Sequence, residues 1–162
     1  MPYLLDSNTF IQAKNQYYPF AVCPGYWDWL LQANQEGKVF SVEKVKEELV
    51  KGNDELAAWA GKRSAHFFLS ADQETLSALT KVSAWVTRQN YEQAAITEFL
   101  QKADYFLIGC ALAHGHTVVT HEVIADTVKK VKIPNVCTGL NIKCLNTFAM
   151  LAAEKACFVL GK

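Results

Sequence analysis

Several features that would assign a function at once are missing from this sequence of 162 residues. Charged residues interrupt each apolar stretch before it reaches the roughly 18 residues that a membrane span needs. The first residues are already acidic and structured, so we expect neither a signal peptide nor a membrane partner. The 16 basic and 16 acidic residues balance. Net charge therefore neither favours nor excludes nucleic acid, and any basic binding surface must be local.

Nucleotide-binding and zinc-binding motifs are also missing. No G-x-G-x-x-G or P-loop pattern follows a predicted strand, which argues against a nucleotide-binding Rossmann protein. The 5 cysteines are dispersed without a C-x-x-C pair, and the 4 histidines form no zinc-ligand spacing with them. This odd, scattered set predicts reduced thiols in a cytoplasmic protein. No repeat or flexible linker divides the chain, so we predict one domain over residues 1–162.

The most informative segment lies at the start, where Tyr3-Leu4-Leu5 runs directly into Asp6, Ser7 and Asn8. A continuous apolar run bounded by polar residues is typical of a short strand buried on both faces. In parallel α/β sheets, ligands bind beyond the carboxyl ends of the strands, where Asp6 would lie. Asp6 could instead cap a helix that begins near Thr9, because Asp is a common helix N-cap. For this residue alone, both interpretations stay open.

Two further acids are predicted on helices that turn an apolar face to the protein interior. Glu48 lies at the border of the apolar face of a helix over residues 43–50. Asp104 lies on the apolar face of a helix over residues 103–115. A buried carboxylate is costly without a partner, so Asp104 there needs a hydrogen bond or a cation. The alternative is that the helix dipole favours Asp104 in the first turn.

A fourth acid repeats the arrangement at Asp6. Glu122 follows an apolar strand over residues 116–120 whose last residue is Thr120. We therefore expect Asp6 and Glu122 to emerge at the same edge of a parallel sheet. Asp126 is the alternative fourth acid.

Basic and aromatic residues could supply contacts to a nucleic acid. The positive charges of Lys129, Lys130 and Lys132 belong either to a solvated loop or to a contact with a phosphate backbone. Lys14 is a further candidate for a phosphate contact. The neighbouring aromatic residues at 17–20 are either core or a stacking surface for bases, and core packing is the favoured interpretation.

The order of the predicted elements indicates an α/β fold with a central parallel sheet of four to five strands flanked by helices. The four acids would then face one cleft, where carboxylates repel one another unless a cation neutralises them. Oxygen ligands favour Mg²⁺ or Mn²⁺. Such a metal can activate water for attack on a phosphodiester.

The segments around the acids also carry a family resemblance. They are Tyr3-Leu4-Leu5-Asp6-Ser7-Asn8-Thr9-Phe10-Ile11, Glu47-Glu48-Leu49, Ala103-Asp104-Tyr105-Phe106-Leu107-Ile108 and Val118-Val119-Thr120-His121-Glu122. With these segments in this order, the sequence resembles the PIN domain superfamily. Two further segments are similar to its DUF4411 branch: Ala13-Lys14 with Tyr17-Tyr18-Pro19-Phe20, and Lys129-Lys130-Val131-Lys132-Ile133-Pro134.

The resemblance implies a Rossmann-like fold and Mg²⁺- or Mn²⁺-dependent ribonuclease activity. Many relatives are VapC-type toxins of bacterial type II toxin–antitoxin pairs, commonly homodimers that a small antitoxin inhibits. The positions that match the metal-binding acids are Asp6, Glu48, Asp104 and Glu122, the last of which is usually an aspartate. The positions that match polar residues ordering the site are Ser7, Asn8 and Thr120. The alternative is a non-catalytic module of the same fold that binds RNA or protein.

Overall fold

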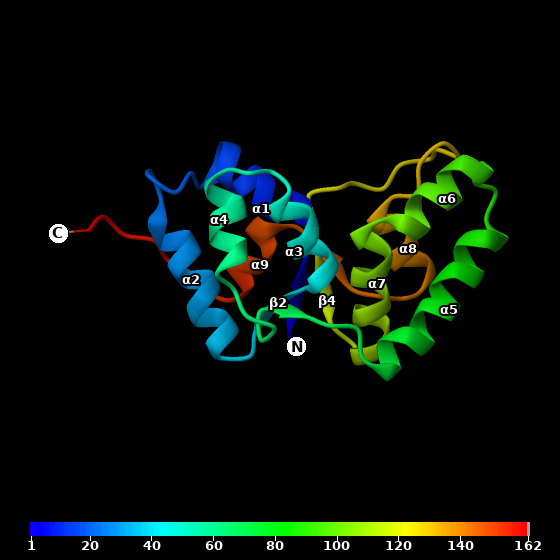
Figure 1. Ribbon diagram of the computed structural model, residues 1–162, viewed down its shortest axis with the longest axis horizontal. Coiled ribbons are helices and arrows are strands. Elements are labelled where there is room, and N and C mark those ends of the chain that lie inside the picture. Colours follow the sequence, from blue (N-terminus) through cyan, green and yellow to red (C-terminus); the bar gives the residue numbers. More distant parts are fainter. Residues whose placement is uncertain (162) are drawn as a thin grey trace.

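A five-stranded parallel sheet forms the centre of the protein (Figure 1). We describe residues 1–161 in a computed structural model. The strands are β1 (Tyr3–Leu5), β2 (Val39–Val42), β3 (Phe68–Leu69), β4 (Thr117–Val119) and β5 (Cys144–Leu145). Their order is β3-β2-β1-β4-β5, with each neighbouring pair parallel. The predicted α/β fold is confirmed.

Strand β1 is central because its residues are apolar on both faces. Leu4 and Leu5 are completely buried, as expected for a parallel strand that helices cover on both sides. Leu5 pairs with Val119 of β4, and the backbone N–H of Asp6 then donates to the Val119 carbonyl at 3.0 Å. The carboxyl ends of β1 and β4 are therefore fixed side by side.

Helices lie on both sides of the sheet (Figure 1). One group contains α1 (Ser7–Gln12), α2 (Pro24–Gln35), α4 (Glu55–Gly61) and α9 (Thr147–Ala153). The other contains α5 (Gln73–Arg88), α6 (Gln93–Gln101), α7 (Ala103–His114) and α8 (Ile133–Gly139). Helix α3 (Glu43–Val50) follows β2 and contacts both α4 and α7. Buried residues of both groups join the strands in one hydrophobic core.

The first helix differs from the prediction at its start. It begins at Ser7 rather than Thr9, and after α1 the chain continues as a π-helix, η1 (Ala13–Tyr17). The wider turn is closed by a hydrogen bond of 2.7 Å from the Tyr18 N–H to the Ala13 carbonyl. Such short π-helical segments are frequent at functional sites.

The last helix begins directly after β5. Thr147 is the first residue inside α9, and it is buried. Asn146 is the cap, and its Oδ1 accepts a hydrogen bond from the Ala149 N–H at 2.8 Å. Asn146 can do so because its backbone is extended, which aims the amide at the third helical N–H.

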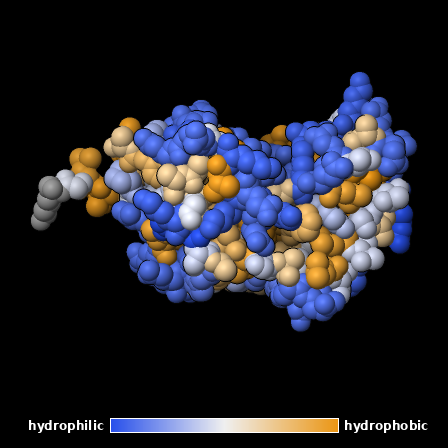
Figure 2. Space-filling model, viewed as in Figure 1, coloured by the Kyte–Doolittle hydropathy of each residue, from blue (hydrophilic) through white to orange (hydrophobic). Residues whose placement is uncertain are grey.

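The surface in Figure 2 is largely hydrophilic, with apolar residues along the C-terminal tail. Val159 and Leu160 in this tail are 83% and 97% exposed. No helix within residues 1–161 is both long enough and apolar enough to cross a membrane. The cysteines are all free thiols.

Helix α8 packs closely on α5. Gly139 at the end of α8 faces the indole ring of Trp85 in α5. A Cβ at position 139 would collide with three atoms of that ring, so only glycine allows this approach.

We expect Gly139→Ala to destabilise the protein by about 1–3 kcal/mol, the usual cost of adding a methyl group to a packed contact. Gly61→Ala is the matched control, because a Cβ at the end of α4 meets no atom within 4 Å. Urea denaturation of both variants measures the difference. Equal stability of the two variants would show that α8 can move away from Trp85 without cost.

Candidate metal centre

Asp6 lies at the carboxyl edge of the sheet, where β1 ends, and is 2% exposed. Its two carboxylate oxygens have different partners. Oδ1 accepts a hydrogen bond from the Thr9 N–H at 3.0 Å, and Oδ2 accepts one from the Thr120 hydroxyl at 2.6 Å. Asp6 is therefore itself the N-cap of α1, which confirms one of the two interpretations of this residue. The Asp6 side chain thus caps α1 and also lies near the other acids at the sheet edge.

Burial raises the pKa of Asp6 from its ordinary value of 3.8 to about 7. The hydrogen bonds from Thr120 and Thr9 oppose this rise, while the negative charges of Asp104 and Glu122 add to it. Asp6 thus lies close enough to both acids to sense their charges. The structure brings these three predicted residues to one region.

Glu48 connects two helices at the same edge. Its Oε2 accepts a hydrogen bond of 2.5 Å from the Ser7 hydroxyl in α1. Its Oε1 accepts a bond of 3.3 Å from the Ala103 N–H, at the beginning of α7. A carboxylate at a helix N-terminus is stabilised by the unpaired N–H groups and by the helix dipole. Ser7 therefore positions Glu48, and Glu48 is bonded to the first turn of α7, which carries Asp104.

Asp104 is the second acid with an unusual proton affinity. Burial, together with the charges of Glu122 and Glu48, raises its pKa from 3.8 to about 6. The charges of Lys102 and Lys130 act in the opposite direction. Asp104 lies in the first turn of α7, where the helix dipole favours an acid, and the residue is half-buried rather than fully inside the protein.

Glu122 is held by the opposite end of its loop. Its backbone N–H donates to the Thr120 hydroxyl oxygen at 3.1 Å. Its Oε2 accepts a hydrogen bond of 2.8 Å from the Ile133 N–H at the start of α8. The Thr120 hydroxyl thus joins Asp6 and Glu122, which places it at the centre of the site.

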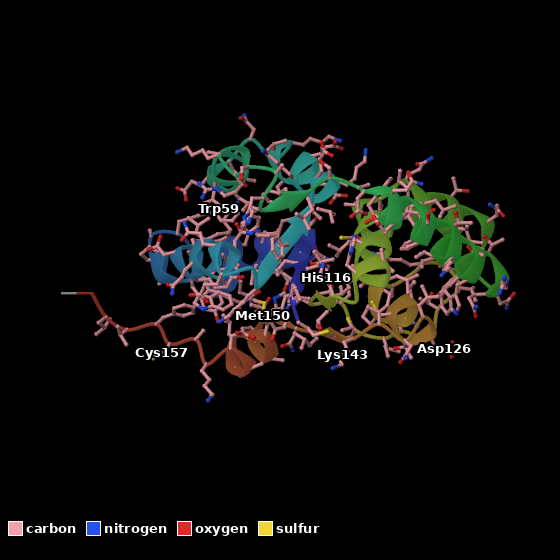
Figure 3. All side chains as sticks on the ribbon, turned by 90° about the horizontal axis from the view of Figure 1, so that it is seen from below. Trp59, His116, Asp126, Lys143, Met150 and Cys157 are labelled. Atoms are coloured by element: carbon pink, nitrogen blue, oxygen red, sulfur yellow. The ribbon has the colours of Figure 1, made fainter. Side chains whose placement is uncertain are left out.

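The alternative fourth acid, Asp126, is exposed and belongs to the loop beside α8 (Figure 3). The charges that shift the pKa of Asp6 and Asp104 come from other residues, Glu122 among them. Glu122 is therefore the better candidate for the fourth position.

The predicted basic contacts divide into two groups. Lys14 lies in η1 and forms a salt bridge of 2.7 Å with Asp54, so its charge is already paired. Lys129 and Lys130 are exposed in the loop before α8, and Lys132 is half-buried at the N-cap of that helix. Lys130 reaches the acids electrostatically, since its charge lowers the pKa of Asp104.

Sequence reasoning missed Lys102, which precedes α7 directly. Its charge lowers the pKa of Asp104. The pKa of Lys102 itself is raised mainly by the bond to Glu98, and to a smaller extent by the charges of Asp104 and Glu122. A lysine two residues before a buried acid was the available signal. Its Nζ also forms a salt bridge of 2.7 Å with Glu98.

The chemistry of the edge fits a hard divalent cation, since every charged donor is a carboxylate oxygen and two of the acids hold protons unusually tightly. No three of the four acids have ligand atoms within 4.8 Å of one another, as far as residues 1–161 show. Glu48 and Glu122 each turn one oxygen toward a backbone N–H at the start of a helix.

A separate group of side chains is close enough to hold a metal ion. The ligand atoms of Asp72, Glu74 and His114 lie within 4.8 Å of one another, and all three residues are exposed. His114 Nε2 and Asp72 Oδ2 already form an ion pair of 2.7 Å if the imidazole is protonated. His114 ends the helix that Asp104 begins, so ten residues of helix, about 15 Å, separate the two places.

The sequence matches the model of a domain of unknown function, DUF4411, over residues 3–158. The chain belongs to this family. No curated protein matches this DUF4411 chain.

Two solved structures are similar to the DUF4411 chain, each over 90% of it and 98% of their own length. VapBC2 from Rickettsia felis, bound to a DNA fragment from its promoter, has 14% identity and a TM-score of 0.56. FitAcB from Neisseria gonorrhoeae has 16% identity and a TM-score of 0.54. The DUF4411 chain thus has the fold of the PIN domain, as its sequence predicted.

We expect Asp6→Asn to stabilise the metal-free DUF4411 protein at pH 8. Between pH 3.8 and about 7, folded Asp6 keeps a proton that the unfolded chain has lost. The free energy of unfolding therefore falls as the pH rises through this range, and stays low above it. Asparagine carries no charge and still caps a helix, so the variant should gain up to about 4 kcal/mol at pH 8.

Urea denaturation with a chelator present, at pH 8 and at pH 4, measures this gain, which should vanish at pH 4. Asp126→Asn serves as the exposed control and should change stability at neither pH. If Asp6→Asn is less stable than the original protein at pH 8, then the buried charge of Asp6 does not destabilise the folded protein.

Proposed function

We propose that this protein is an Mg²⁺- or Mn²⁺-dependent endoribonuclease, the toxin of a bacterial type II toxin–antitoxin pair. The observation that carries the proposal is the buried Asp6, with a pKa of about 7 in the field of two further acids. A fold that holds such groups together against their repulsion is typical of a functional site. Membership of the DUF4411 family and a fold shared with VapBC2 and FitAcB support the same conclusion.

In this proposal the metal is held by the four edge acids, Asp6, Glu48, Asp104 and Glu122. A bound Mg²⁺ or Mn²⁺ supplies activation of water and stabilises negative charge on the phosphodiester. The chain's own polar groups keep the acids in place. The Thr120 hydroxyl orients Asp6, the Ser7 hydroxyl orients Glu48, and Asn8 lies beside them at the start of α1.

The RNA backbone is proposed to pass over the loop before α8, with Lys129, Lys130 and Lys132 as phosphate contacts. Lys130 supports this path because its charge reaches Asp104. Lys14 would have to exchange its ion pair with Asp54 for a phosphate. The protein partners would be a small antitoxin and a second copy of the chain, in the cytoplasm.

One observation favours a second candidate, a non-catalytic PIN-fold module that binds RNA or protein. Glu48 and Glu122 each accept a hydrogen bond from an N–H at the start of a helix. Within residues 1–161, no three of the four edge acids have ligand atoms within 4.8 Å of one another. If these bonds persist when a divalent cation is offered, the acids have a structural role only.

We expect Asp104→Asn to reduce RNA cleavage in Mn²⁺ by at least about 100-fold, because loss of groups that merely support a metal ligand already costs roughly 10–100-fold. Cleavage of total RNA by both proteins, with sites mapped by sequencing, is the measurement. Asp126→Asn is the control and should cut at the original rate. A wild-type protein that binds RNA but cuts none in Mn²⁺ would leave the non-catalytic module as the function.

A further inference from the structure

Two aromatic side chains stand apart from the others by their exposure. The chain has 9 phenylalanines, 6 tyrosines and 4 tryptophans. Within residues 1–161 only Tyr17 and Phe148 are exposed, at 37% and 43% of their surface. The favoured interpretation that the aromatic residues at 17–20 pack in the core is wrong for Tyr17, although Tyr18 and Phe20 do pack against it.

These two exposed rings are neighbours. Their centroids are 4.8 Å apart, and the rings meet edge to face at 86°. His121 packs against both, at 5.4 Å from Tyr17 and 5.5 Å from Phe148. Three segments distant in sequence thus form one aromatic group. We call its two exposed rings the Tyr17–Phe148 pair, and His121 is the ring that supports them.

The Tyr17–Phe148 pair borders the acid site on the side of β4 and β5. His121 stands between Thr120 and Glu122, which both belong to the site. Tyr17 is the last residue of η1, in the helical segment that Asp6 caps, and Phe148 lies in the first turn of α9 directly after β5. All three rings therefore follow carboxyl ends of parallel strands, on the same edge as the acids.

The exposed rings are flanked along the chain by polar or small residues. Asn146 and Ala149 are exposed on either side of Phe148, and Gln16 is exposed beside Tyr17. A broad protein-docking face would need a larger continuous apolar area. An exposed aromatic face of this size matches a single nucleobase, because each base offers a π-face for stacking.

We propose that the Tyr17–Phe148 pair is a stacking platform for an unpaired base of single-stranded RNA next to the cleaved phosphate. This inference rests on the proposed function, since it assigns the surface that holds the substrate of that site. Tyr17 and Phe148 contact the base. His121 is a positioning residue, because its ring packs against both of theirs.

Binding without cleavage tests the platform. Fluorescence anisotropy with labelled oligomers of A, C, G and U, in a chelator that removes divalent ions, separates binding from catalysis. We expect Phe148→Leu, which keeps apolar bulk but loses the ring, to weaken binding of at least one oligomer about tenfold. Tyr17→Leu should have a similar effect. Phe148→Trp should bind as tightly as the original protein, and its additional indole emission should be quenched by the RNA.

The control is Leu76→Ala, at an apolar residue of α5 that is 49% exposed. It should leave binding unchanged. Wild-type affinity in both leucine variants would overturn the platform, even if Mn²⁺-dependent cleavage is found. The platform stands and the nuclease fails if RNA binding depends on Phe148 but no cleavage occurs. Binding of none of the oligomers by the original protein would overturn the platform directly.

Discussion

The hydrogen bond from the Thr120 hydroxyl to Asp6 joins the ends of the two central strands, and the acid site is arranged around it. The same hydroxyl oxygen accepts the Glu122 N–H, so one threonine fixes two acids. Asp6 is fully enclosed there, which raises its pKa to about 7 and makes its charge costly. The protein therefore keeps at its sheet edge a group that lowers its own stability at neutral pH.

Glu48 and Glu122 connect the sheet edge to the helices. Glu48 bridges α1 and α7, and Glu122 bridges the end of β4 and α8, each through a helix N-terminal N–H. These bonds hold Glu48 and Glu122 close enough to Asp104 for their charges to raise its pKa. A cation that bound here would have to compete with N–H donors at Glu48, Glu122 and Asp6. It would also displace the protons that the raised pKa values leave on Asp6 and Asp104.

Local patterns predicted the parts of this arrangement that depend on neighbouring residues. The apolar run into Asp6 predicted a strand buried on both faces, and the period of residues 43–50 predicted α3 with the bounds it has. The bond from Ile133 to Glu122 could not be predicted, because it depends on how a loop without regular structure returns to the sheet. The group of Asp72, Glu74 and His114 likewise needs the packing of α5 on α7. The exposure of Tyr17 and Phe148 could not be predicted either, because it depends on whether distant segments of the chain cover their rings.

Proton release on metal binding tests most directly the claim that the raised pKa values belong to a cation site. Calorimetric titration with Mn²⁺ in buffers of different ionisation enthalpy counts the protons that leave. With pKa values of about 7 for Asp6 and about 6 for Asp104, we predict release of more than one proton per ion at pH 6 and almost none at pH 8.5. Mn²⁺ binding that releases no protons at pH 6, or that persists unchanged in a protein carrying Asp6→Asn and Asp104→Asn, would contradict the account.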